Sequence, residues 1–78
     1  MSIFVATIVC DEETSIETRV FGSFEAARIF IFLEICQNHE NHEITREDIR
    51  LNEIVDDGES TYPYMYKISH HELYIFIS

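Results

Sequence analysis

The chain has 78 residues, of which 46% are hydrophobic, and a formal net charge of −10 from 15 acidic and five basic residues. This length predicts one domain with a small core, and the apolar content is too high for a disordered tail. So acidic a surface repels phosphate groups, which excludes direct binding to nucleic acid or to anionic membranes as an expected function. No apolar run approaches the ~18 residues of a membrane span and no charged signal-peptide start is visible, so we expect a cytoplasmic protein.

The first part of the chain predicts a β-hairpin. Residues 3–10 are β-branched and apolar, as in a strand covered on both faces, and residues 15–21 alternate, as in a half-buried strand. The polar segment of residues 11–14 between them is short, which favours antiparallel pairing.

A helix is expected over residues 24–38, because Ser23 suits the N-cap position and Glu25 suits the first turn. Plotted at ~100° per residue, the helix carries two apolar stripes. The first contains Ala26, Ile29, Phe30, Leu33 and Cys36, and the second contains Phe24, Ala27, Ile31 and Ile35. A helix that lies on one sheet can bury only one stripe against it. We predict that the second stripe is left uncovered by the sheet and that its residues Phe24, Ile31 and Ile35 mediate self-association.

A polar connection over residues 39–48 follows the helix. Thr45 and Asp48 in this connection fit a capping box, so a short helical turn is expected there. Alternation over residues 49–55 then predicts a third strand.

Two further strands are expected near the end of the chain. The dipeptide Asp57-Gly58 predicts a tight turn, after which residues 61–69 alternate strictly. His70-His71 predicts a second turn before a last strand over residues 73–77. The order β-β-α-β-β-β predicts one α+β domain over residues 1–78, with a single antiparallel sheet of about five strands and one helix packed on one face.

Catalytic and metal-binding patterns are weak. With two glycines in the chain a backbone phosphate cradle is not expected, and no nucleophile or metalloprotease motif is present, so we predict no enzymatic activity and no cofactor. The four histidines, His39, His42, His70 and His71, are expected as solvated turn residues, with a metal site or a pH sensor as the alternative. Cys10 and Cys36 are expected as reduced, buried thiols.

Acidic residues and tyrosines give the functional signal. Eight acids lie between residues 40 and 59, and three tyrosines project from one face of the strand that follows. The acids are either a solubilising surface or a charge pattern that imitates nucleic acid, and tyrosine is enriched at binding surfaces. The predicted partner-binding residues are Glu47, Asp48, Glu53, Asp56, Asp57, Glu59, Tyr62, Tyr64 and Tyr66.

The stretch Val20-Phe21-Gly22-Ser23-Phe24-Glu25-Ala26-Ala27, a strand followed by a helix, resembles many small proteins of phages and other DNA viruses. In charge and size the chain also resembles phage-encoded inhibitors, among them anti-CRISPR proteins and DNA-mimic restriction inhibitors. That resemblance implies an inhibitor in the host cytoplasm that binds the basic surface of a nucleic-acid-handling protein. The alternative is a structural or assembly module that self-associates, as a homodimer, through the spare helix stripe or an open sheet edge.

Overall fold

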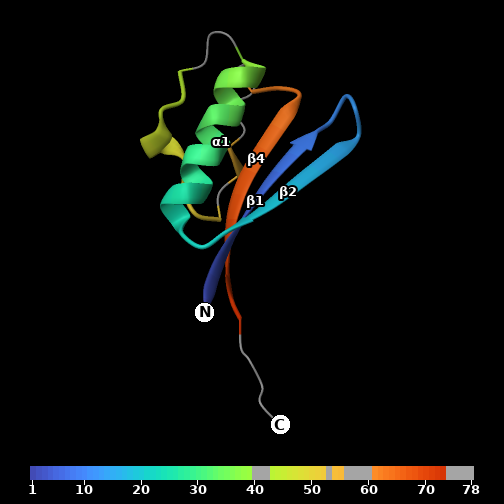
Figure 1. Ribbon diagram of the computed structural model, residues 1–78. Coiled ribbons are helices and arrows are strands. Elements are labelled where there is room, and N and C mark those ends of the chain that lie inside the picture. Colours follow the sequence, from blue (N-terminus) through green and yellow to red (C-terminus); the bar gives the residue numbers. More distant parts are fainter. Residues whose placement is uncertain (40–42, 53, 56–60, 74–78) are drawn as a thin grey trace.

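In the computed structural model, one helix lies across one face of an antiparallel sheet (Figure 1). The structure describes residues 1–39, 43–52, 54–55 and 61–73. The sheet has three long strands in the order β2-β1-β4, and a two-residue strand, β3, lies beside β4. In chain order the elements are β1 (Ser2–Cys10), β2 (Ser15–Phe21), α1 (Phe24–Asn38), the short 3-10 helix η1 (Arg46–Asp48), β3 (Ile54–Val55) and β4 (Tyr64–Glu72).

The predicted hairpin is confirmed, and β1 becomes the central strand because it pairs on its other side with β4. Ala6, Ile8 and Cys10 point from β1 into the core under α1. Side chains of a strand alternate between faces, so Val5 and Val9 point to the opposite face and remain half-buried. The expectation that β1 is covered on both faces is therefore wrong for the described residues, which place their only α-helix on one side.

The helix spans Phe24–Asn38 as predicted, and the Ser23 hydroxyl accepts a hydrogen bond from the Ala26 amide at 3.1 Å. The assignment of its stripes is wrong. Ile31 and Ile35 are 0% and 1% exposed and pack in the core, whereas Leu33 of the other stripe is 58% exposed. The sheet packs against the second stripe, so Ile31 and Ile35 are not available to a second copy.

The predicted strand over residues 49–55 is replaced by a winding segment. Thr45 and Asp48 form the predicted capping box around η1, and Ile49 then turns into the core with 1% exposure. Leu51 makes one isolated bridge to β4, and Asn52 has a φ of 64°, which interrupts any extended run. Among the described residues of this segment, Ile54–Val55 alone form a strand, and the prediction of about five strands is not confirmed.

The predicted turn at His70-His71 is also wrong, because both histidines belong to β4. His70 pairs with Phe4 of β1 and His71 pairs with Ile3, and the pairing continues to Ser2 opposite Glu72. β4 is therefore as long as β1, because the two strands pair over their whole length. Of the predicted last strand, all but Leu73 lies outside the described residues, as does the turn predicted at Asp57-Gly58.

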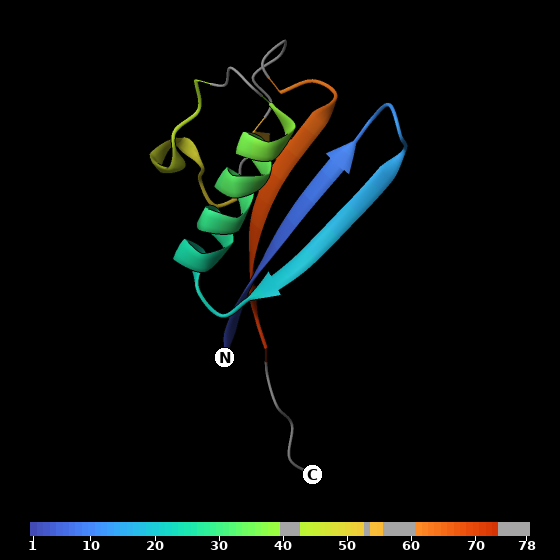
Figure 2. The same cartoon turned by 45° about the horizontal axis from the view of Figure 1, so that its top comes forward.

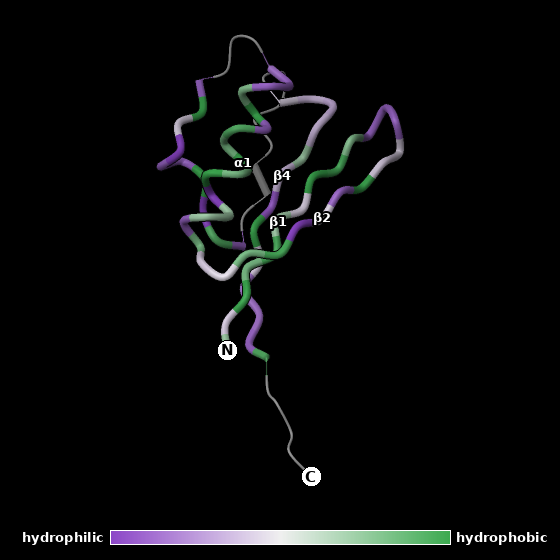
Figure 3. Tube along the Cα trace, viewed as in Figure 1, coloured by the Kyte–Doolittle hydropathy of each residue, from purple (hydrophilic) through white to green (hydrophobic). Residues whose placement is uncertain are grey.

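Figure 3 shows hydrophobic residues along the sheet and α1, and hydrophilic residues in the β1–β2 turn and around η1. Cys10 is buried as predicted, but Cys36 is exposed on α1. No disulfide bond joins the two cysteines.

Candidate functional site

Two turns meet at one end of the sheet, and we call this region the acidic end. It consists of the β1–β2 turn, Asp11 to Thr14, and the turn that leads into β4, Thr61 to Tyr64. The Asp11 amide donates a hydrogen bond to the Pro63 carbonyl at 2.9 Å, and Cys10 pairs with Tyr64. Figures 1 and 2 show the two turns together beyond the upper ends of β1 and β4.

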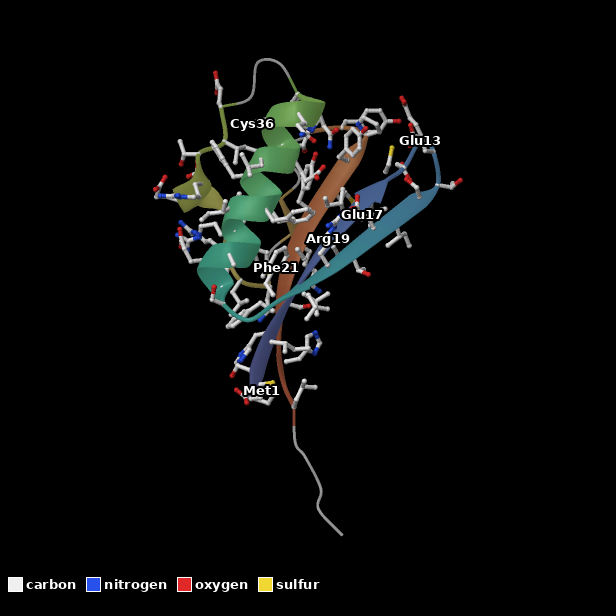
Figure 4. The ribbon with its side chains drawn as sticks, viewed as in Figure 1. Met1, Glu13, Glu17, Arg19, Phe21 and Cys36 are labelled. Carbon is white, nitrogen blue, oxygen red and sulfur yellow. The ribbon has the colours of Figure 1, made fainter. Side chains whose placement is uncertain are left out.

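The acids of this end project from the hairpin tip. Asp11, Glu12 and Glu13 are all exposed, and Figure 4 shows Glu13 at the outer end of the hairpin. The next residue, Thr14, has a φ of 49°, a left-handed conformation that is costly for a β-branched side chain. Its hydroxyl donates a hydrogen bond to the Glu13 carbonyl at 2.7 Å, which fixes the turn beside the acids.

Two of the three predicted tyrosines belong to the acidic end. Tyr62 is 61% exposed, and Tyr64 is half-buried with its ring 5.4 Å from that of His39 in an edge-on arrangement. Burial raises the pKa of Tyr64, and the neighbouring Cys10, Glu13 and Glu12 raise it further. A tyrosine hydroxyl is protonated at neutral pH, and the raised pKa keeps that of Tyr64 a hydrogen-bond donor further into the alkaline range.

Tyr66, the third, is a core residue and not a contact residue. Its side chain is 0% exposed, and its hydroxyl accepts a hydrogen bond from Asn38 Nδ2 at 3.1 Å and lies 3.1 Å from His39 Nε2. Burial raises its pKa to about 12. The tyrosine face predicted from alternation is the face that α1 covers, so exposure falls from Tyr62 to Tyr66 along the chain.

The acids Glu47 and Asp48 lie elsewhere. Figures 1 and 2 both place η1 on the far side of α1 from β4, so α1 separates these acids from the tyrosines. The Asp48 carboxylate accepts hydrogen bonds from the Thr45 amide at 2.8 Å and hydroxyl at 2.9 Å, which lower its pKa. Glu47 lies 3.9 Å from Arg46. The remaining predicted acids, Glu53, Asp56, Asp57 and Glu59, lie outside the described residues.

An apolar groove of about 540 Å³ lies between α1 and the segment of residues 43–47. Ile29, Phe32 and Leu33 form its helix wall, and its other side is lined by residues 43–47, of which three are charged. Two of its helix residues, Ile29 and Leu33, belong to the stripe that was expected to face the sheet. It is distinct from the acidic end, since no residue of the two hairpin turns lines it.

The histidines do not form a metal centre among the described residues, which contain no group of three or more His, Cys, Asp or Glu side chains suited to a metal ion. His39 packs on Tyr64 and Tyr66, whereas His70 stacks on Phe4 with 4.9 Å between ring centroids. Phe4 pairs with the other end of β4, so these two histidines are apart. His42 lies outside the described residues.

Within the part of the chain that the structure describes, no helix has the length and hydrophobicity needed to span a bilayer. Comparison of the chain with protein-family models, with curated proteins and with solved structures finds no match.

Asp11, Glu12 and Glu13 were not among the predicted partner-binding residues. The sequence marks them as an acidic cluster in the first turn, without indicating what lies beside that turn. Their placement beside Tyr62 and Tyr64 depends on the pairing of β1 with β4, which joins opposite ends of the chain and has no local signal.

Proposed function

We propose that this protein is a non-enzymatic inhibitor that binds the basic surface of a nucleic-acid-handling protein through its acidic end. The observation that carries the proposal is the hydrogen bond between Asp11 and Pro63, which brings three exposed carboxylates beside Tyr62 and Tyr64. A net charge of −10 adds a long-range attraction to any basic partner.

The chemistry of such binding is competition for a cationic groove. Carboxylates spaced along a turn present negative charges to lysines and arginines that otherwise contact phosphates. Tyr62 adds an exposed ring and hydroxyl, which suit a surface that stacks bases or packs apolar side chains. The charge and size shared with small phage inhibitors support a CRISPR-Cas or restriction component as the kind of target.

The test uses capture from a host extract at low salt, followed by competition. Captured proteins that release at high salt are purified, and each is incubated with its own DNA or RNA and increasing amounts of the inhibitor. We expect nucleic acid to be displaced, and the double variant Glu12→Lys, Glu13→Lys to lose about tenfold or more in affinity.

The matched control is Glu43→Lys, Glu47→Lys, which changes the net charge equally on residues outside the acidic end. This control should lose much less affinity, and Tyr62→Ala should weaken binding without changing its salt dependence. Equal losses in the two charge-reversal variants, or target binding that leaves the nucleic acid in place, would refute the proposal.

A further inference from the structure

Strand β2 is an open edge of the described sheet. Of the described strands only β1 pairs with it, and six of its seven residues are exposed. Proteins usually guard such edges with proline, bulges, lysine or short strands, because unpaired backbone groups attract other strands. β2 has no proline, lysine or bulge, and its pairing with β1 is continuous over seven residues. Its charged residues, Glu17 and Arg19, disfavour any incoming strand that does not place opposite charges against them.

The sequence of β2 is complementary to itself when read in the opposite direction around Thr18. In an antiparallel pair centred on that residue, Glu17 of one chain faces Arg19 of the second copy, and Arg19 faces Glu17 of the second copy. Ile16 then faces Val20 of the second copy. Figure 4 shows Glu17, Arg19 and Phe21 in succession along this strand, and Ile16 and Val20 are 71% and 63% exposed.

Each face of the sheet is matched in this register. Arg19 and Glu17 pair with Ala6 and Ile8 of β1, so they lie on the face that carries α1. Ile16 and Val20 lie on the opposite face and would cover each other across the strands, which shields apolar surface that one chain leaves in water. In this single register, the pairs of opposite charge all lie on the face that carries α1, and the apolar pairs all lie on the opposite face.

We propose that this chain forms a two-fold symmetric dimer by antiparallel pairing of β2 with β2 of a second copy, centred on Thr18. The two three-stranded halves become one continuous sheet with both helices on the same face. A second copy suits this edge better than a foreign strand, because symmetry repeats each charge contact and each apolar contact twice. The guanidinium of Arg19, which lies 3.2 Å from Glu17 of its own chain, gains a second carboxylate.

The interface is small, so exchange between monomer and dimer is expected and sedimentation velocity is measured over a series of concentrations. Glu17→Arg and Arg19→Glu each place like charges opposite each other twice, and each variant should weaken dimerisation by about tenfold. An equal mixture of the two variants should restore a dimer, and so should the double variant with both changes. Glu17→Arg makes the chain less acidic and Arg19→Glu makes it more acidic. If repulsion between the net charges of two chains controlled dimerisation, the first variant would strengthen the dimer and the second would weaken it.

Register is tested separately by Thr18→Cys in a Cys36→Ser background. Under mild oxidation this variant should form a disulfide-linked dimer through residue 18, whereas Ser15→Cys in the same background should not. Far-UV circular dichroism checks that each variant is folded. A folded wild-type chain that stays monomeric at every concentration overturns the proposal, as does a dimer that neither single charge reversal weakens.

Discussion

Tyr66 joins the core to the acidic end of the sheet. Its ring is fully buried among the residues of β1 and α1, and its hydroxyl contacts Asn38, the last residue of the helix, and His39, the C-cap residue. The ring of Tyr64, which lies at the acidic end, stacks on it with 6.1 Å between centroids. Tyr66 therefore fixes the helix end and the neighbouring tyrosine together.

Removing the hydroxyl in Tyr66→Phe is expected to cost about 1 kcal/mol in the free energy of unfolding. The buried ring remains, but Asn38 loses its acceptor and must turn to water. Urea denaturation measures the change. Tyr62→Phe is the matched control, because Tyr62 is mostly exposed and its loss should be near zero. Equal costs for the two variants would contradict the role given to Tyr66.

The stability of the protein should fall at alkaline pH because of the same residue. Burial raises the pKa of Tyr66 to about 12, above the value of ~10 for an unfolded tyrosine. The unfolded chain releases this proton first, so the stabilisation is complete below about pH 10 and is lost as the pH rises from about 10 to about 12.

The expected loss is about 2 kcal/mol from Tyr66, and the raised pKa of Tyr64 acts in the same direction. Urea denaturation between about pH 9 and pH 12 measures it. Tyr66→Phe should show a shallower decline than the wild type, and parallel declines would argue against a buried phenol.

The apolar residues of α1 do not reveal from sequence alone which side of the helix faces the sheet. Both of its stripes are apolar, so periodicity predicts a buried helix without saying which side faces the sheet. The position of the segment that contains Ile44 and Ile49 determines the side, because those residues join the core beside α1 and leave Leu33 at the surface.

The same substitution on the two stripes tests this arrangement. Ile31→Val removes one buried methylene and should cost about 1 kcal/mol, whereas Ile29→Val, at a residue 39% exposed, should cost less than half of that. Thermal or urea denaturation of both variants gives the comparison. A larger cost for Ile29→Val would mean that the stripes are the other way round.

Elements with local signals were predictable, and elements with distant partners were not. The first hairpin, the helix with its Ser23 cap and the capping box at Thr45 all follow from neighbouring residues. β4 runs through His70 and His71 because β1 pairs with it over its whole length, which a turn-like dipeptide does not reveal. The acidic end depends on that same pairing, and of the predicted site residues that the structure describes, Tyr62 and Tyr64 are the ones that lie on it.

For the whole molecule, repulsion among the excess negative charges destabilises the folded state. The net charge is −10, while the described ion pairs that link segments distant in sequence are few and exposed, such as Arg46 with Glu25 at 3.5 Å. Exposed pairs contribute little, so repulsion among carboxylates is the larger electrostatic effect on folding.

Potassium chloride should therefore raise the melting temperature, by a few degrees between low and physiological ionic strength, because it screens this repulsion. Differential scanning calorimetry measures the change, and sucrose at matched osmolality controls for solvent exclusion. A melting temperature that falls with added salt would show that attractive pairs dominate instead.

The central position of β1 also has a kinetic consequence. Its partner β4 follows the hairpin, the helix and the winding segment in sequence, so a long loop must close before the middle of the sheet exists. On a ribosome, α1 emerges before Tyr66 and Ile68, so Ile31 and Ile35 lack these two core partners until β4 has emerged. We expect docking of β4 to limit the rate of folding, and Ile68→Val to slow refolding in stopped-flow experiments more than Ser23→Ala does.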